Sequence, residues 1–525
     1  MFMHMTFTTA LNLAVCLDNS ARYYANKTAL VYGDTRMTYA QVNGAACQIA
    51  NAMVSKGLKA GDHIALSCLN LPYFPIIYNA ILKIGATVVP LSIFLKKREI
   101  AYHLKDSDSV AYFCFVGTPE LPMGQYGFDG FNEVESCKNF WLITPPGVES
   151  PIPGASTLNE LMKDQSPKFD TVATDPNSTA VILYTSGTTG QPKGAELSHW
   201  NMYTNALTCI TLVNADSSDI QLIALPLYHS FGQSVQMNSG ILAGATLVLI
   251  ARGSDMDAIL SGFEKENVTL FAGVPTMYWG LLNHPNASNY DLAKIASNLR
   301  FCSSGGAAIP VEIMKGFEEK FKVQILEGYG LSETSPVATF SRMDLEKKPG
   351  SIGLPIKGVD LMVADQDGNK APVDDIGEIW IRGPNVMKGY YKKQEATDKV
   401  FKNGWFATGD LGRMDEDGYF YIVDRIKDMI IRGGFNVYPR EIEEVLMTHP
   451  AISLAAVVGE PDDKYGEEIK AYVVLKAGAS ATEQEIVEWS KQEMANYKYP
   501  RKVVIRTELP MGATGKILKR VLKEQ

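Results

Sequence analysis

The chain has 525 residues, of which 46% are hydrophobic and 20% are charged, and its net charge at pH 7 is −9. This composition is ordinary for a globular protein, and the length predicts two to four domains. The acidic balance and the lack of basic runs argue against nucleic acid as a partner, and no apolar run is long enough for a transmembrane helix. Seven cysteines without a CxxC motif or metal-ligand spacing indicate reduced thiols and a cytoplasmic location.

The first 115 residues alternate between strand and helix patterns. An apolar patch at 10–17 has no Lys or Arg before it and is interpreted as the start of a helix rather than a signal peptide. The alternation that follows predicts an α/β sheet with helices on its faces. Strands are expected at 27–37 (two, around a Gly33-Asp34 turn), 63–68 and 87–90, and helices at 38–56 and 73–84. Residues 117–177 are rich in Pro, Gly, Asp and Ser and are expected to be mostly loop.

A loop that suits a polyphosphate follows the apolar strand pattern at 179–184. It reads Tyr184-Thr185-Ser186-Gly187-Thr188-Thr189-Gly190-Gln191-Pro192-Lys193-Gly194. Glycines let backbone N–H groups converge on phosphate oxygens, hydroxyl groups add donors, and a lysine adds a charge. A flexible surface loop is the plain alternative. A P-loop is disfavoured, because Gln191 and Pro192 separate Gly190 from Lys193, and no Ser or Thr follows the lysine.

The rest of the chain divides into three parts. The α/β pattern continues with a helix at 198–212 and strands at 221–225 and 323–326, and the segments 242–250 and 269–272 continue the alternation between them. Beyond residue 350, Gly and Asp turns recur among β-leaning runs and predict a β-rich section. The last hundred residues predict a small α+β unit, with helices at 439–447 and 483–495 and strands at 451–458 and 468–475.

Four further segments carry residues suited to nucleotide chemistry. The first is Glu327-Gly328-Tyr329-Gly330-Leu331-Ser332-Glu333-Thr334. Its Tyr329, between two glycines, can stack on a nucleobase, and its Glu333 carboxylate can hold Mg²⁺ beside a phosphate. Asp410, after a glycine turn, can accept hydrogen bonds from a ribose diol or simply form an Asx turn. The third is the charged segment Asp424-Arg425-Ile426-Lys427-Asp428, which precedes Gly433-Gly434. Its charged residues would also suit a solvated linker. Lys516 ends a glycine-containing loop that could carry it into a cleft, although a lone lysine is usually a surface charge.

These five segments together resemble the motifs of the adenylate-forming (AMP-binding) superfamily. This superfamily contains acyl-CoA synthetases, aryl-CoA ligases, firefly-type luciferases and nonribosomal-peptide adenylation domains. Segments 271–278 and 383–391 are most similar to bacterial medium- and long-chain fatty-acid CoA ligases. The resemblance implies a multi-domain α/β fold. A large N-terminal domain, 1–424, would have two α/β subdomains and a β-rich subdomain, and a small mobile α+β domain, 425–525, would turn on a hinge near Lys427.

The resemblance also implies a role for each motif residue. Thr185 and Glu333 would hold Mg²⁺, Tyr329 would pack on adenine, and Thr334 would meet the α-phosphate. Asp410 and Arg425 would bind the ribose, and Gly433 and Gly434 would line the pantetheine tunnel after domain rotation. Lys516 would bind the carboxylate and α-phosphate and stabilise the transition state of adenylation. The implied catalytic set is Thr185, Lys193, His229, Glu333 and Lys516. The implied nucleotide and CoA contacts also include Ser186, Gly187, Thr188, Thr189, Gly190, Lys193, Gly306, Glu327, Gly328, Gly330, Ile422, Lys427 and Phe435.

The acid substrate is expected to be a fatty acid. His229 stands where peptide-synthetase adenylation domains carry an Asp that pairs with an ammonium, and a buried unpaired ammonium is costly. The implied acyl contacts are His229, Gln233, Gly305, Gly306, Ala307, Gly328 and Gly330. The small residues Gly305, Gly306, Ala307 and Gly328 leave room for a chain, and an apolar tunnel without a polar end would suit an aliphatic acid at ~0.8 kcal/mol per buried CH₂.

The expected reaction uses ATP, Mg²⁺ and CoA and converts the fatty acid to acyl-AMP plus pyrophosphate, then to acyl-CoA plus AMP. Three alternatives stay open. A fatty-acyl-AMP ligase would load an acyl carrier protein, but its insertion ahead of the hinge is not seen between 350 and 410. An aryl-CoA ligase would need a shorter pocket. A non-catalytic acyl- or nucleotide-binding protein would have lost Lys193, Glu333 or Lys516. The oligomeric state is open, with a homodimer among the options.

Overall fold

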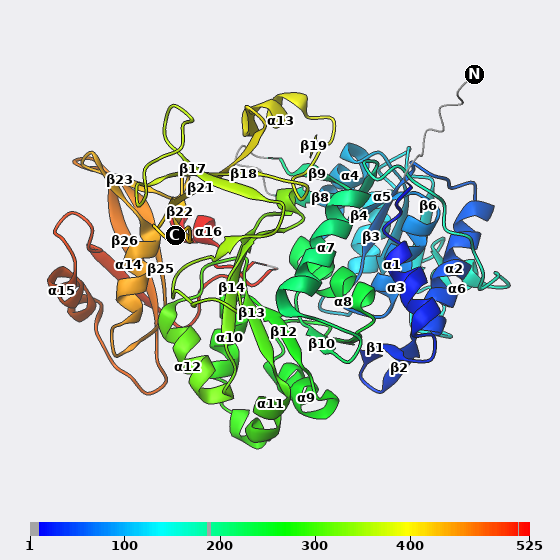
Figure 1. Ribbon diagram of the computed structural model, residues 1–525, viewed down its shortest axis with the longest axis horizontal. Helices are drawn as coiled ribbons and strands as arrows, with labels where there is room; N and C mark the ends of the chain where they lie inside the picture. The colour runs from blue at the N-terminus through cyan, green and yellow to red at the C-terminus, as the bar shows by residue number, and fades with distance from the viewer. Residues whose placement is uncertain (1–9, 186–190, 513) are drawn as a thin grey trace.

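The computed structural model describes residues 10–185, 191–512 and 514–525 (Figure 1). Its strands form four sheets, of eight, nine, five and five strands. The centre of the expected phosphate loop, Ser186 to Gly190, lies outside the described residues, so the contacts expected for Ser186, Gly187, Thr188, Thr189 and Gly190 stay predictions. None of the described helices is long and apolar enough to cross a membrane.

The first sheet has the strand order β19-β9-β8-β4-β3-β5-β6-β7. Strands β8, β4, β3, β5 and β6 run parallel and are largely buried, as expected for strands covered on both faces, whereas β9 and β19 are antiparallel additions at one end. Helix α2 begins at Thr38, whose side chain forms a capping box with Gln41. The strands are β3 (His63–Ser67), β4 (Thr87–Pro90), β5 (Ser109–Phe115), β6 (Asn139–Ile143), β7 (Ser156–Thr157), β8 (Thr179–Thr185), β9 (Lys193–Ser198) and β19 (Gly389–Tyr390). The helices are α1 (Val15–Tyr23), α2 (Tyr39–Ser55), α3 (Tyr73–Lys83), α4 (Lys97–Asp106), α5 (Met123–Phe131) and α6 (Leu158–Met162).

The expectation that 117–177 is mostly loop is confirmed for most of this region, which also supplies the short elements α5, β6, β7 and α6. Helix α5 contains three glycines that approach neighbouring side chains closely: a Cβ at Gly127 would lie 2.6 Å from Cys114 Sγ. The glycines therefore serve close packing of a helix on its sheet, although their number indicates a loop when the sequence is considered alone.

The second sheet has the order β16-β15-β14-β13-β12-β10-β11-β1-β2 and takes its last two strands from the start of the chain. The strands are β1 (Thr28–Tyr32), β2 (Thr35–Thr38), β10 (Ile220–Ile223), β11 (Thr246–Leu249), β12 (Leu270–Gly273), β13 (Phe301–Ser304), β14 (Ile325–Gly330), β15 (Val337–Phe340) and β16 (Leu354–Pro355). The helices are α7 (His199–Val213), the π-helix η1 (Phe231–Asn238), α8 (Ser239–Ala243), α9 (Met256–Glu266), α10 (Pro275–Leu282), η2 (Ala287–Asn289), α11 (Leu292–Asn298), α12 (Val311–Phe321) and η3 (Ser332–Thr334). Strands β12, β13 and β14 are parallel, so their carboxyl ends meet at one edge, where ligands of α/β sheets gather.

The two smaller sheets follow in sequence and confirm the predicted β-rich section and the predicted small α+β unit at the end of the chain. The β-rich sheet contains β17 (Asp360–Ala364), β18 (Gly377–Arg382), β20 (Phe401–Lys402), β21 (Trp405–Met414) and β22 (Phe420–Arg425), with α13 (Gln394–Val400) beside it. The C-terminal sheet contains β23 (Ile430–Arg432), β24 (Phe435–Val437), β25 (Ile452–Asp462), β26 (Gly466–Leu475) and β27 (Lys502–Arg506). Its helices are α14 (Pro439–Met447), α15 (Glu483–Glu493) and α16 (Lys519–Lys523).

The C-terminal unit lies at one end of the molecule, beside α10 and α12 (Figure 1). Two hydrogen bonds join it to α10: Trp279 Nε1 donates to Ser453 Oγ (2.8 Å), and Thr276 Oγ1 donates to the Gly515 carbonyl (2.7 Å). Arg425 is the last residue of β22 and pairs with Asp410 across the β-rich sheet, and Lys427 follows in the segment before β23.

Candidate functional site

Lys516 reaches the edge where β12, β13 and β14 end. Its side chain lies against Gly306, where an added Cβ would be 3.4 Å from Lys516 Cε. Gly306 also has a φ of +82°, a conformation that favours glycine. The turn that carries Lys516 is held by the bond from Thr276 to Gly515. A lysine from the C-terminal unit is thus placed at the strand ends of the large domain.

Lys516 shares this place with charges of both signs. Burial, and then the Arg425 charge, lower the pKa of its ammonium to about 8, although Asp410 and Glu333 act in the opposite direction. An anionic ligand beside the ammonium would favour its charged form. The site is therefore a partly dehydrated cation set between two carboxylates.

His229 lies between β10 and η1, close enough to Lys516 for the lysine charge to affect it. Burial, and then that charge, lower the pKa of His229 to about 3, so the imidazole is neutral at physiological pH. Its Nδ1 accepts from the Phe231 N–H at 3.3 Å, which leaves the ring hydrogen on Nε2. Phe231 in turn approaches Gly305: a Cβ at Gly305 would lie 3.2 Å from the Phe231 ring and 3.1 Å from the Gly328 carbonyl oxygen.

Tyr329, Asp410 and Arg425 form a second group. The Tyr329 hydroxyl donates to Asp410 Oδ2 at 2.6 Å, and Arg425 Nε lies 3.1 Å from Asp410 Oδ1. Asp410 is buried, whereas the Arg425 side chain is about half exposed. Burial and the Asp410 charge raise the pKa of Tyr329, so its hydroxyl stays a donor. Each carboxylate oxygen retains acceptor capacity for a further donor.

Glu333 belongs to a third group that includes a residue the sequence reasoning missed. The Glu333 carboxylate is buried and accepts from the Tyr390 hydroxyl at 3.0 Å. Lys193 Nζ lies 5.3 Å from the centre of the Tyr390 ring, and Thr185 pairs with Lys193 across β8 and β9. Tyr390 itself lies on β19, which pairs with β9. The segment that contains Gly389-Tyr390 supports the family resemblance, but Tyr390 was assigned no role from the sequence. That resemblance was the available sequence signal for a functional role of Tyr390.

Two residues of the Glu327–Thr334 segment use their side-chain polar groups in hydrogen bonds to the protein backbone. Thr334 is fully buried, and its hydroxyl accepts from the Leu331 N–H (2.9 Å) and donates to the Pro336 carbonyl. Glu327 is buried and accepts from the Ile309 N–H at 3.3 Å, and burial raises its pKa to about 7. The roles expected for Thr334 at a phosphate and for Glu327 at the nucleotide stay predictions.

The residues expected to meet CoA lie on the surface of the C-terminal unit. Gly433 and Gly434 form the β23–β24 turn with φ values of +57° and +84°, a conformation that favours glycine. Phe435 is 57% exposed and stacks on Tyr497 with ring centres 4.9 Å apart. The expected hinge residue Lys427 is exposed in the segment before β23, and Ile422 lies on β22 of the β-rich sheet, where its carbonyl accepts from Arg440 at 2.5 Å.

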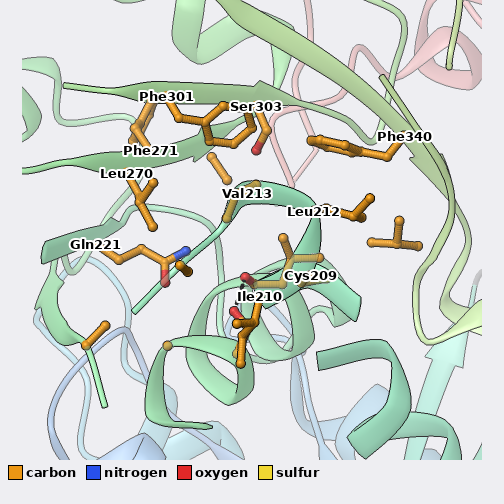
Figure 2. A pocket seen from close by; sticks show the side chains of 17 residues that line it. Cys209, Ile210, Leu212, Val213, Gln221, Leu270, Phe271, Phe301, Ser303 and Phe340 are labelled. Carbon is orange, nitrogen blue, oxygen red and sulfur yellow. Dashed lines mark hydrogen bonds between the residues drawn. The ribbon is translucent and has the colours of Figure 1, made fainter. Parts of the chain in front are cut away.

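An apolar cavity lies between α7, η1 and the strands β10, β12, β13 and β15 (Figure 2). Most of its lining is aliphatic or aromatic, including Val213, Leu270, Phe301 and Phe340. Phe340 also lies against Gly328, where an added Cβ would be 2.7 Å from its ring. The cavity therefore adjoins the small residues expected to admit an acyl chain.

The lining differs in two ways from the expected tunnel. The predicted acyl contacts are next to the lining rather than part of it, and Gln233 is fully buried with its Nε2 donating to the Leu227 carbonyl at 3.2 Å. The tunnel was also expected to have no polar end, yet Gln221 lines the cavity. These positions depend on how α7 and η1 pack on the sheet, which the linear sequence does not specify.

The donor set fits a magnesium ion that arrives with a phosphate ligand. No group of three His, Cys, Asp or Glu residues converges anywhere in the described parts of the chain. Mg²⁺ is commonly held by one or two carboxylates together with substrate phosphates and water. The buried carboxylate of Glu333 matches that pattern, and its partner Tyr390 has its ring centre 5.3 Å from Lys193 Nζ at the end of the phosphate-type loop.

Comparisons with known proteins agree with this geometry. The family model "AMP-binding enzyme" matches residues 17–391, and the model "AMP-binding enzyme C-terminal domain" matches 441–516. A long-chain-fatty-acid–CoA ligase of Bacillus subtilis is 36% identical over 529 residues, covering 97% of this chain and 93% of the relative. A feruloyl-CoA synthase of Amycolatopsis sp. is 34% identical over 500 residues, covering 95% and 96%.

A solved structure of a related enzyme is also similar to this chain in three dimensions. The structure of ATP-bound MatB from Rhodopseudomonas palustris matches with a TM-score of 0.89 at 31% identity, covering 98% of this chain and 99% of that one. The likeness therefore includes the C-terminal unit as well as the two large sheets.

Proposed function

The chain belongs to the AMP-binding enzyme family as an AMP-forming acid–CoA ligase that uses ATP, Mg²⁺ and CoA, and we propose that its acid is a medium- or long-chain fatty acid. The observation that carries the substrate proposal is the apolar cavity beside Gly328. A saturated chain buried there would gain ~0.8 kcal/mol per CH₂. The similarity to a feruloyl-CoA synthase makes an aryl acid the second candidate.

In the first half-reaction, an oxygen of the acid's carboxylate attacks the α-phosphorus of ATP. The bond from that phosphorus to the bridging oxygen breaks, and pyrophosphate leaves. We assign Lys516 to the carboxylate and α-phosphate, because its ammonium lies at the strand ends and would offset the repulsion between two anions. Neutral His229 would add a donor through Nε2 without adding charge.

The nucleotide would be held by the group of Tyr329, Asp410 and Arg425 and by the group that contains Glu333 and Tyr390. Asp410 and Arg425 are assigned to the ribose, Tyr329 to the adenine side, and Thr185 and Lys193 to the phosphates. Glu333, supported by Tyr390, is assigned to magnesium. Bound Mg²⁺ neutralises phosphate charge and so assists departure of pyrophosphate.

In the second half-reaction, the thiol of CoA loses its proton to solvent, its sulfur attacks the acyl carbon, and AMP leaves. We propose that the C-terminal domain, 425–525, first rotates about a hinge near Lys427 and withdraws Lys516. The exposure of Gly433, Gly434 and Phe435 supports this, because a surface that meets CoA after rotation need not be buried before it. One site would then serve two chemistries by domain exchange. A cytoplasmic location suits the seven cysteines, all buried and unpaired.

The test measures pyrophosphate release and acyl-CoA formation with ATP, Mg²⁺ and a panel of acids from acetate to stearate plus benzoate and cinnamate. A maximum among aliphatic acids with CoA-dependent turnover supports the proposal. A maximum at benzoate or cinnamate contradicts it in favour of an aryl acid. Pyrophosphate release without acyl-CoA would indicate a carrier-protein acceptor.

A further inference from the structure

The polar side chains of Gln221, Ser239 and Ser303 interrupt the apolar lining of the cavity. Gln221 lies on β10, is 6% exposed and lines the cavity, with its amide drawn toward the interior (Figure 2). The amide lies beside Gly240: a Cβ added there would come within 2.9 Å of Gln221 Oε1. Glycine at this position therefore leaves the room that the amide occupies.

The Gln221 amide has no hydrogen-bond partner among the residues that the structure describes, and the side-chain donors of Tyr39, Ser239 and Gln236 are already engaged elsewhere. Tyr39 Oη donates to the Ala245 carbonyl at 2.6 Å, and Ser239 Oγ donates to the Val235 carbonyl at 2.5 Å. Gln236, which follows the lining residue Val235 on η1, donates through Nε2 to the Leu222 carbonyl at 2.9 Å, and its Oε1 has no partner among the described residues. Gln221 thus presents its amide to the cavity rather than to the protein.

An amide that faces a cavity without a protein partner is costly unless water or a ligand meets it. Leaving such a group unsatisfied costs about 1–3 kcal/mol, and nearly all buried polar groups in folded proteins are paired. Leu270 and Phe301, which also line the cavity, offer no hydrogen-bonding atom from their side chains. The hydroxyl of Ser303 is a second polar group of the lining, and it too has no partner within the described parts of the chain. A partner for Gln221 must come from what enters the cavity.

We propose that Gln221 recognises a hydrogen-bonding oxygen, a hydroxyl or oxo group, on the acid substrate at a distance from its carboxylate. This inference rests on the proposed function, because it takes the cavity to be the acyl site. The amide can donate to either oxygen and can also accept from a hydroxyl. Sites built to hydrogen-bond a substrate group discriminate against analogues that lack it, because the amide is then left unpaired. The enzyme should therefore prefer oxygenated acids to plain acids of the same length.

Two sources supply this chemistry, an aliphatic acid with a hydroxyl group near its far end and a phenolic aryl acid. The experiment measures kcat/KM for matched pairs: hexanoate, decanoate and myristate against their terminally hydroxylated counterparts, and cinnamate against para-hydroxycinnamate. The wild type is compared with Gln221→Met, which keeps the volume and removes the amide. Leu212→Met is the control, because Leu212 lines the same cavity and has no polar group.

The wild type should favour the oxygenated member of at least one pair, and Gln221→Met should lower that preference about tenfold. Leu212→Met should leave the preference unchanged. Thermal unfolding checks that Gln221→Met folds, and its Tm should equal or exceed that of the wild type. Equal kcat/KM within every pair, or the same preference in both variants, would overturn the inference and indicate that trapped water satisfies the amide. A preference confined to the aryl pair keeps the role of Gln221 and rejects the aliphatic proposal.

Discussion

Replacing Tyr390 with Phe removes one hydroxyl and keeps the ring. That hydroxyl donates to the buried Glu333 carboxylate at 3.0 Å, whereas the ring lies 5.3 Å from Lys193 Nζ. A hydrogen bond to a charged group contributes about 1.5–3 kcal/mol, which corresponds to roughly 10- to 150-fold in an equilibrium or rate constant. If Glu333 holds magnesium, Tyr390→Phe should weaken binding of Mg-ATP and lower kcat/KM for ATP by at least about tenfold.

Two measurements test this prediction. Titration calorimetry gives the affinity for Mg-ATP without turnover, and pyrophosphate release at varied Mg²⁺ concentration gives the metal dependence of adenylation. The matched control is Tyr391→Phe, since the Tyr391 hydroxyl donates to Asp108 at 2.7 Å and not to Glu333. Tyr390→Phe should require more Mg²⁺ than Tyr391→Phe. Identical magnesium dependence in the two variants would refute the reasoning and leave Tyr390 a packing residue.

Three further predictions concern Lys516 and its turn. Lys516→Ala should lower adenylation by several orders of magnitude while thioester formation from supplied acyl-AMP largely survives; equal loss in both half-reactions would contradict domain exchange. Because burial and Arg425 lower the pKa of Lys516 to about 8, the ammonium is lost as pH rises through that value. Adenylation kcat/KM should therefore fall above pH 8 in the wild type. In a stopped assay, Lys516→Arg should show no such fall, since Arg stays charged. Thr276→Val removes the hydrogen bond to Gly515 and should slow adenylation about fivefold, with thioester formation as the internal control.

Local patterns in the sequence were enough to place many elements. The helix expected at 439–447 coincides with α14, and the hairpin around Gly33-Asp34 is the β1–β2 pair. Both depend on signals within a few residues, such as Pro439 at the first helical turn. Motif spacing also determined the family, because that match needs residue types in order and no coordinates.

Only the tertiary structure decided which distant groups meet. Tyr390 and Glu333 are 57 residues apart and come together because β19 joins the first sheet beside β9. The strand pattern of β10 does not say that Gln221 faces a cavity closed by α7 and η1. Within the largely irregular region 117–177, the glycines of α5 allow this helix to pack closely on its neighbours, a role that their number alone does not indicate. Sequence periodicity specifies local conformation and which face is buried, whereas the partner of each buried group depends on packing between segments far apart in the chain.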